Sequence, residues 1–362
     1  MHDLCALCEL CERHIFLLLA FRILGIFIMS SLLEVENLHV DIPIVTGDLH
    51  AVRGIDFTVG KGETLGLVGE SGCGKSMTAL ALMNLLPKSA IRKASLLAFS
   101  GKDLVELKER EMADIRGDRM SMIFQEPMTS LNPSYTIGNQ LMEVMIRHRR
   151  VSRSEARRRA VFLLEKVGIS AAKSRLGQYP HQLSGGLRQR VMIAMALMCD
   201  PELIIADEPT TALDVTIQAQ ILHLLRGLQR EFRMGMILIT HDLGIVARVT
   251  DRVAVMYAGQ IVETGTVRDV FTRPLHPYTY GLLDCIPIPG KTQHGEFLGS
   301  IPGMVPTPVG ALAGCAFRNR CSFTFQDCAI QGPGMCMVSE THGYRCLLEP
   351  EKLAKRAKSN QQ

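Results

Sequence analysis

Alternating apolar and polar side chains mark the first regular part of the chain. The alternation covers residues 32–40 and again residues 50–59, and a period of two is typical of half-buried antiparallel strands. Residues 63–87 then contain a short apolar run, a glycine-rich loop and an apolar helical segment that Pro87 ends. The pattern therefore predicts an antiparallel sheet followed by a strand–loop–helix unit.

The middle of the chain, residues 140–200, has the periodicity of helices. Ser152 and Glu155 have the spacing of a capping box, and Gly168 is placed to end the helix that they begin. The basic residues between Arg147 and Arg159 fall at helical spacing beside that capping box. They are therefore interpreted as a solvated helix face and not as a nucleic-acid site.

Two later apolar runs end in polar or charged residues. Residues 202–208 read ELIIADE, and residues 235–242 read GMILITHD. Buried parallel strands whose C-terminal ends hold functional side chains have this pattern. After about Asp269 proline, glycine and cysteine follow in irregular order, which predicts a domain boundary there and a C-terminal extension over residues 269–362.

Composition adds little beyond this pattern. The 362 residues are 47% hydrophobic and have a net charge of +4, which is typical of a globular protein and does not require a nucleic-acid partner. Residues 1–29 combine Cys5, Cys8 and Cys11 with an apolar run that Arg22 interrupts. The run is short for a membrane span, lacks a signal-peptide cleavage site, and its cysteines lack the fourth member of a ferredoxin pattern. We expect this extension to be dispensable, with the working protein beginning at Met29.

The glycine-rich loop GESGCGKS has the pattern G-x4-G-K-[ST] between a strand and a helix. Its backbone N–H groups can surround phosphate oxygens, Lys75 can reach the β and γ phosphates, and the Ser76 hydroxyl can bind Mg²⁺. The motif alone does not distinguish a kinase from a GTPase or a transport ATPase. The predicted nucleotide-binding residues here are Gly69, Glu70, Ser71, Gly72, Cys73, Gly74, Lys75, Ser76 and Met77.

Carboxylates at the end of an apolar strand indicate hydrolysis. Asp207 can hold Mg²⁺ through water, and Glu208 can orient and deprotonate the attacking water. His241 ends the next strand, where its imidazole can contact the γ-phosphate and that water. Gln125 follows another strand on a loop from which it can reach the metal.

A second anion-binding helix end occurs at residues 183–190, LSGGLRQR. Ser184 is a good N-cap, and Gly185 and Gly186 allow a phosphate to approach the backbone closely. The chain has a single lysine-bearing phosphate loop. We therefore expect Ser184 to serve a nucleotide that another subunit holds.

The ordered motifs around Lys75, Gln125, Ser184, Asp207, Asp214 and His241 resemble those of the ATP-binding subunits of ABC transporters, over residues 32–268. The resemblance implies an α/β fold of the P-loop NTPase type, with an ABC-type ATP-binding domain over residues 30–268. It implies an antiparallel β subdomain, a helical subdomain at about 126–183 and a small irregular cysteine-rich C-terminal domain. It further implies a head-to-tail dimer with two ATP molecules at the interface.

The same resemblance assigns roles to individual residues. Lys75, Glu208 and His241 would be catalytic, and Ser76, Gln125 and Asp207 would bind Mg²⁺. Ser184, Gly185, Gly186 and Asp214 would close on the partner's nucleotide. One departure concerns the base: the family has an aromatic residue that stacks on adenine, yet no Phe, Tyr or Trp occurs between Phe27 and Phe57. His50 or an aliphatic neighbour is expected to take that position.

Three further segments resemble the peptide-uptake branch of importers: MTSLNP at 128–133, HPYTYGLL at 276–283 and GCAFRNRC at 314–321. The resemblance implies an ATPase that energises import of di- or oligopeptides from the cytoplasmic face of the inner membrane, to which it is bound peripherally. Its expected partners are a second ATP-binding subunit, two membrane permeases and an external substrate-binding protein, with no nucleic acid. A nickel importer is the alternative. A soluble ATPase acting on DNA or ribosomes is disfavoured, because the motif set occurs once and the helical insert is short.

The C-terminal cysteines suggest a metal centre. Disulfides are disfavoured in a protein that uses cytosolic ATP, and the closely spaced cysteine pairs of many zinc sites are absent after Cys315. Widely spaced thiolates suit an iron–sulfur cluster, and the peptide-uptake branch is associated with a [4Fe-4S] cluster here. Zinc or plain buried thiols remain alternatives, and Cys336 is the spare cysteine. The expected ligands, in a structural role, are Cys315, Cys321, Cys328 and Cys346.

Overall fold

A computed structural model describes residues 31–211, 213–286, 299–310 and 312–353. The chain divides into two compact units, and every described residue except Ser31 belongs to the unit that begins at Leu32. The predicted N-terminal extension, residues 1–29, lies outside the described residues.

An antiparallel sheet forms the first layer of this unit. β1 and β2 pair along almost their whole length, which confirms the strands predicted at 32–40 and 50–59. Both strands are longer than predicted, because the pairing continues through exposed residues on either side of the turn, where apolar alternation stops. The strands are β2 (Gly47–Val59), β1 (Leu33–Ile44), β5 (Leu96–Phe99) and β6 (Lys102–Asp103), and β4 (Ile91–Lys93) also pairs with β1.

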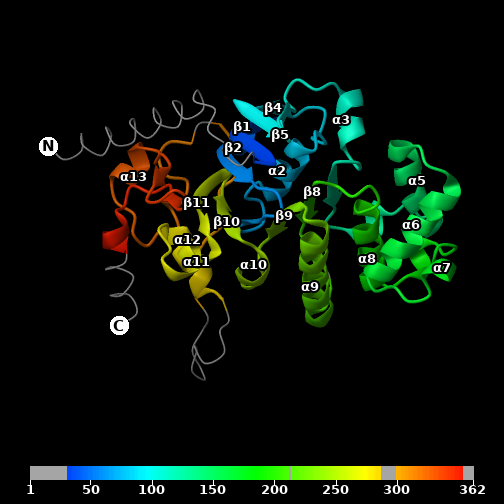
Figure 1. The fold of residues 1–362 in the computed structure, drawn as a ribbon. Helices are drawn as coiled ribbons and strands as arrows, with labels where there is room; N and C mark the ends of the chain where they lie inside the picture. The colour runs from blue at the N-terminus through cyan, green and yellow to red at the C-terminus, as the bar shows by residue number, and fades with distance from the viewer. Residues whose placement is uncertain (1–30, 212, 287–298, 311, 354–362) are drawn as a thin grey trace. The chain divides into compact units, whose positions relative to one another are not determined.

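A second sheet forms the centre of the fold (Figure 1). Five of its strands are parallel, in the order β10 (Arg252–Tyr257), β3 (Thr64–Val68), β9 (Gly235–Thr240), β8 (Leu203–Asp207) and β7 (Met120–Ile123). Every residue of β3, β8 and β9 is buried, as their uninterrupted apolar sequences predict for strands covered on both faces.

The same sheet continues with short antiparallel strands from the end of the chain. β11 (Gln260–Thr266) pairs with β10, β13 (Gly343–Tyr344) pairs with β11, and β12 (Cys336–Met337) pairs with β13. Residues far beyond Asp269 therefore return to the main sheet and extend it.

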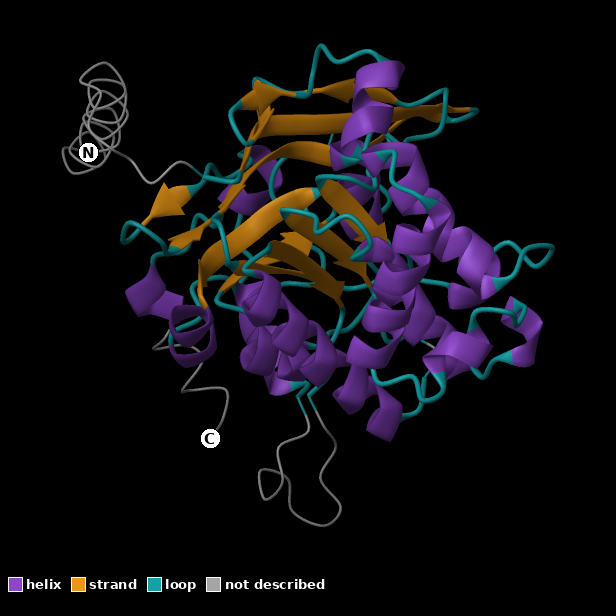
Figure 2. Cartoon of the chain, turned by 45° about the vertical axis from the view of Figure 1, so that its right-hand side comes forward, coloured by secondary structure: helices purple, strands orange, loops and turns teal. Residues whose placement is uncertain are grey.

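Helices fill the predicted middle region and connect the strands (Figure 2). Ser152 accepts a hydrogen bond from the Glu155 N–H at the start of α6, and Gly168, with φ 78°, follows its end, as predicted. No helix within the described ranges is long and apolar enough to cross a membrane. We call residues 183–190, LSGGLRQR, the signature segment. The helices before it are α2 (Lys75–Leu82), α3 (Glu109–Ile115), α4 (Pro127–Ser130), α5 (Ile137–Arg149), α6 (Arg153–Lys166), α7 (Ala172–Arg175) and the 3₁₀ turn η1 (Pro180–Gln182).

The remaining helices are α8 (Gly185–Ala196), α9 (Val215–Phe232), α10 (Leu243–Val249), α11 (Val267–Thr272), α12 (Pro277–Asp284) and α13 (Asp327–Ile330). One hydrophobic core joins the helical region to the parallel strands, and another fills the space between the two sheets and α2. A third joins β10 to the C-terminal part of the chain through Tyr257, Tyr278 and Phe317. The C-terminal part thus shares its core with the sheet that bears the phosphate loop.

Candidate functional site

The glycine-rich loop occupies the turn between β3 and α2. Gly69 and Gly74 have φ values of 153° and 105°. A Cβ atom on Gly69 would lie 2.2 Å from the Met256 carbonyl oxygen, and one on Gly74 would lie 2.4 Å from the Ala51 carbonyl oxygen. Neighbouring backbone therefore requires glycine at both positions, which fixes the path of the loop.

Lys75 begins α2 and is buried. Its ammonium donates hydrogen bonds to the Gly69 and Glu70 carbonyl oxygens, at 2.8 and 2.9 Å. Cys73 lies beside it, with its Sγ 3.8 Å from Nζ, and burial raises the pKa of this thiol. The positive charge is therefore held at the start of a helix by neutral groups, and it remains available to an anion.

Asp207 ends β8 and faces the start of α2. The Ser76 hydroxyl donates to its Oδ1 at 3.1 Å. Burial raises the pKa of Asp207, and the Ser76 hydrogen bond opposes this shift. A hydroxyl and a buried carboxylate are oxygen ligands of the kind that Mg²⁺ binds, so the donor set fits this cation.

Glu208 has φ 44°, an unusual conformation for a residue with a side chain. Its carboxylate Oε2 accepts hydrogen bonds from Gln125 Nε2 at 3.0 Å and Thr211 Oγ1 at 2.9 Å. His241 Nδ1 lies 3.5 Å from Oε1. Gln125 and His241, both predicted, thus meet at the carboxylate of Glu208, which was also predicted. Thr211 was not predicted, although its position three residues after Glu208 was an available signal.

The second predicted anion site is formed by two helix starts. Ser184 caps α8 by accepting from the Leu187 N–H, and Asp214 caps α9 by accepting from the Ile217 N–H. A Cβ on Gly186 would lie 3.3 Å from the Ile217 side chain, so these two starts are neighbours. Within the described residues, no hydrogen bond joins Ser184 or Asp214 to Lys75 or Glu208.

Two contacts to the phosphate loop come from the C-terminal part of the chain. Arg320 pairs with the Glu70 carboxylate, and the Glu70 N–H donates to the Tyr278 hydroxyl. Sequence reasoning did not predict either contact. Both residues lie in motifs quoted above, HPYTYGLL and GCAFRNRC, which were the only signal.

His50, one candidate for the position of the missing aromatic residue, already has partners. Its Nδ1 lies 2.6 Å from Asp41 Oδ1, and its backbone N–H donates to the Pro308 carbonyl. Its role toward adenine stays a prediction.

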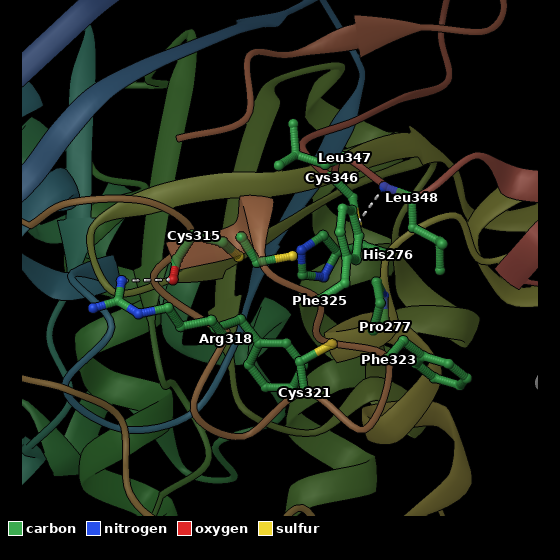
Figure 3. A pocket seen from close by; sticks show the side chains of 12 residues that line it. His276, Pro277, Cys315, Arg318, Cys321, Phe323, Phe325, Cys346, Leu347 and Leu348 are labelled. Carbon is green, nitrogen blue, oxygen red and sulfur yellow. Dashed lines mark hydrogen bonds between the residues drawn. The ribbon is translucent and has the colours of Figure 1, made fainter. Parts of the chain in front are cut away.

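The four C-terminal cysteines predicted as ligands line a single pocket (Figure 3). Its cavity, about 10 Å³, has room for about one water molecule. Burial raises the pKa of Cys321 to about 11 and that of Cys346 to about 12, and neighbouring thiols add to both effects. The rest of the lining is mostly apolar and aromatic: His276, Pro277, Phe317, Arg318, Phe323, Phe325, Leu347 and Leu348.

This pocket is not a ready site for a single ion such as zinc. Among the described residues, no three His, Cys, Asp or Glu side chains are arranged as ligands of one metal ion. The four thiols come from separate turns and share this one pocket, and cysteine thiolates are the ligands of iron–sulfur clusters. Cys336 is exposed on β12 and does not line it, in agreement with its expected status as the spare.

Two family models match the chain. The first, described as ABC transporter, matches residues 52–211. The second, described as the C-terminal region of oligopeptide/dipeptide transporters, matches residues 262–328. The two matches together include the phosphate loop, Glu208 and three of the four pocket cysteines.

Curated relatives match over nearly their full length. The oligopeptide transport ATP-binding protein OppD of Bacillus subtilis (strain 168) is 51% identical over 89% of this chain and 90% of that protein. The dipeptide transport ATP-binding protein DppD of the same organism is 49% identical, over 90% of this chain and 96% of that protein. A putative peptide import ATP-binding protein of Brucella abortus (strain 2308) is 51% identical, over 88% of this chain and 97% of that protein.

Solved structures match about two thirds of the chain, between 65% and 67% of its residues. The ATP-binding cassette MJ0796, in a dimeric post-hydrolysis state bound to ADP and Pi, has a TM-score of 0.58 and 26% identity. The match covers 65% of this chain and 99% of that chain. The fold is thus that of an ATP-binding cassette, with additional C-terminal elements.

Proposed function

Because the chain belongs to the ABC transporter family, among the ATP-binding proteins of oligopeptide and dipeptide transport, we propose that it hydrolyses ATP to energise peptide import. The observation that carries this proposal is the arrangement around Glu208. A carboxylate at the end of a buried strand is held by Gln125, Thr211 and His241, beside an intact phosphate loop. These are the groups that hydrolysis requires.

Each group has a role in this reaction. Lys75 neutralises charge on the phosphates, while Ser76, Asp207 and Gln125 bind Mg²⁺. Glu208 orients and deprotonates the attacking water, and His241 contacts the γ-phosphate beside it. The other loop residues, from Gly69 to Met77, surround the phosphates through the backbone and the start of α2.

The signature segment completes a site in a second subunit. Ser184, Gly185, Gly186 and Asp214 lie at adjacent helix starts, and among the described residues no hydrogen bond joins Ser184 or Asp214 to Lys75 or Glu208. A head-to-tail dimer would bring them to the partner's nucleotide. The likeness to the cassette MJ0796, solved as a dimer bound to ADP and Pi, supports this arrangement.

The proposed assembly contains a second ATP-binding subunit, two membrane permeases and an external substrate-binding protein, with this chain peripheral on the cytoplasmic face of the inner membrane. The relatives reported above are named as proteins of oligopeptide, dipeptide or peptide transport, which favours peptides over nickel as the substrate. A single motif set disfavours a role on DNA or ribosomes.

Uptake of a labelled tripeptide tests this proposal. Cells that lack the gene should regain uptake with the wild-type chain but not with Glu208→Gln, because a general base contributes about 10²–10⁴-fold to a rate. Purified Glu208→Gln should bind ATP normally. Wild-type complementation of nickel uptake but not of peptide uptake would contradict the peptide assignment.

We also propose that Cys315, Cys321, Cys328 and Cys346 hold a [4Fe-4S] cluster. Their gathering in one pocket supports it. When bound, the cluster would supply a covalent cross-link to a segment with a small core of its own, Phe323, Leu348 and Leu353. About four irons and four sulfides per chain, in protein purified without oxygen, would support it. Stoichiometric zinc, or no metal, would contradict it.

A further inference from the structure

Residue Glu70, the second of the phosphate loop, is held by side chains from the far end of the chain. Arg320 Nη1 donates to Glu70 Oε2 at 2.6 Å, and Nη2 donates to Oε1 at 2.9 Å. The backbone N–H of Glu70 donates to the Tyr278 hydroxyl at 2.9 Å. Side chain and backbone of one loop residue are thus both bound to the C-terminal part.

The guanidinium of Arg320 is itself fixed. Its Nε donates to the Pro302 carbonyl at 2.8 Å, and Nη2 also donates to the Ile301 carbonyl at 3.1 Å. Its central carbon, Cζ, lies 5.8 Å from the centre of the Tyr257 ring, and the Arg320 side chain is only 4% exposed. Because the planar group is held by carbonyls and an aromatic ring, it presents a defined edge to Glu70.

Glu70 connects this fixed group to the lysine that faces the phosphates. The Lys75 ammonium donates to the carbonyl of Glu70 and to that of Gly69, the residue before it. A shift of Glu70 would therefore move both acceptors of Lys75. Ser71 and Gly72, which follow, are exposed, so the loop has few other restraints on this side.

We propose that Arg320 is a positioning residue for ATP binding, which orders the phosphate loop through Glu70. The proposal rests on the ATP-binding role proposed above. Glycine-rich loops lose much conformational entropy when they close around a ligand, and an anchor that orders the loop beforehand lowers that cost. The cysteine-rich segment, in which Arg320 directly precedes Cys321, is thereby part of the nucleotide site.

Two other roles for Arg320 make different predictions. It could hold only the C-terminal part in place, in which case Glu70 would not matter for ATP. It could also only neutralise the Glu70 carboxylate, which would otherwise repel phosphate. Removal of Glu70 should then leave ATP binding unchanged or stronger.

Binding of a fluorescent ATP analogue to the full-length chain, with thermal unfolding measured in parallel, separates these roles. Lys75→Ala, compared with wild type, first shows that the signal comes from the phosphate loop, and absence of wild-type binding would overturn the ATP role itself. We expect Arg320→Met to raise Kd about tenfold, the equivalent of one charge-assisted hydrogen-bond pair, and Arg320→Lys to raise it less. Arg345→Met is the matched control, because Arg345 also donates to two backbone carbonyls, those of Ile261 and Pro333, and is not among the residues that line the cysteine pocket.

The partner substitution decides the mechanism. Glu70→Ala should also raise Kd, and the double variant should bind no more weakly than Arg320→Met alone, because the two residues act as one unit. Three results would each overturn the proposal. They are wild-type affinity for the ATP analogue in folded Arg320→Met, normal or stronger binding of the analogue by Glu70→Ala, and losses of affinity that add in the double variant. If Arg320→Met does not fold, Glu70→Ala alone decides, since it changes only a partly exposed loop side chain.

Discussion

Gly72 and Gly74 of the phosphate loop both have positive φ, at 80° and 105°. Only at Gly74 would an added side chain meet neighbouring backbone. A Cβ on Gly74 would lie 2.4 Å from the Ala51 carbonyl oxygen, whereas one on Gly72 would have no neighbour within 4 Å. Gly72→Ala should therefore cost only the strain of the left-handed region, about 1–2 kcal/mol. Gly74→Ala should cost more and abolish ATP binding, because β2 must move away. Urea unfolding and nucleotide binding of the two variants measure this difference, and equal losses would contradict it.

Thr211 acts on ATP hydrolysis through one side-chain hydrogen bond, which it donates to Glu208. Its hydroxyl donates to Glu208 Oε2 at 2.9 Å, and Glu208 is already in an unusual backbone conformation. Thr211→Val removes the donor and keeps the shape, so we expect kcat to fall about tenfold or more, the equivalent of one hydrogen bond to a carboxylate. The KM for ATP should change little. A steady-state phosphate-release assay measures both, and a raised KM with unchanged kcat would contradict this role.

Residues in short motifs could be predicted from the sequence, and residues that act across the fold could not. Lys75 and Ser76 follow from a local pattern, because one turn of backbone forms their site. Arg320 is 250 positions away from Glu70, and no local spacing reports such a pair. That Cys315, Cys321, Cys328 and Cys346 share one pocket agrees with the ligand set that the resemblance to the peptide-uptake branch implies.

At the scale of elements, the start of α12 contains a buried titratable group. His276 caps this helix by accepting the Tyr278 N–H at Nδ1, and burial lowers the pKa of His276 to about 3 from its usual 6.5. In the unfolded chain the imidazole takes up a proton below about pH 6.5, but in the folded chain it does so only near pH 3. The stability contribution of the neutral ring is complete above pH 6.5. It falls by about 1.4 kcal/mol per pH unit as the pH drops toward 3.

His276→Asn isolates this effect, because asparagine retains an acceptor for the cap but does not titrate. Between pH 7 and pH 5 the wild-type chain should lose about 2 kcal/mol more of its free energy of unfolding than the variant does. Urea unfolding at the two pH values measures the difference. Other titratable groups, Asp207 among them, contribute the same pH dependence to both proteins, so their effect on the free energy of unfolding cancels in the comparison. Equal pH dependence of the two proteins would contradict the assignment.

The elements of the cassette itself could be predicted because their apolar patterns are long. Those of the C-terminal part could not, since β12 and β13 have two residues each and no measurable period. A buried carboxylate organises them instead. Glu263 on β11 accepts hydrogen bonds from the Leu275 and His276 N–H groups and lies 3.0 Å from His342 Nε2. Such a convergence requires three distant segments and is visible only in the fold.

At the scale of the whole molecule, two of the attachments between the C-terminal part and the cassette bear on the nucleotide site and the main sheet. β13 pairs with β11 at the edge of the main sheet, and Arg320 and Tyr278 reach the phosphate loop. Three of the four pocket cysteines lie between Tyr278 and β13 in sequence and Cys346 follows β13, while Cys315 and Cys321 flank the Arg320 segment. Loss of the proposed cluster should therefore affect ATP binding as well as stability.

Cys321→Ser tests this connection. We expect the variant to lose bound iron, to unfold at a temperature lower by about 5 °C or more, and to bind the fluorescent ATP analogue more weakly than wild type. The physical reason is that Cys321 directly follows Arg320, so loss of the cross-link frees the guanidinium that orders Glu70. Cys336→Ser is the matched control, because Cys336 is exposed and outside the pocket. Weaker ATP binding by Cys321→Ser with normal binding by Cys336→Ser would connect the cysteine pocket to the nucleotide. Wild-type unfolding temperature and ATP affinity in iron-free Cys321→Ser would show that the pocket has no structural role and no influence on the phosphate loop.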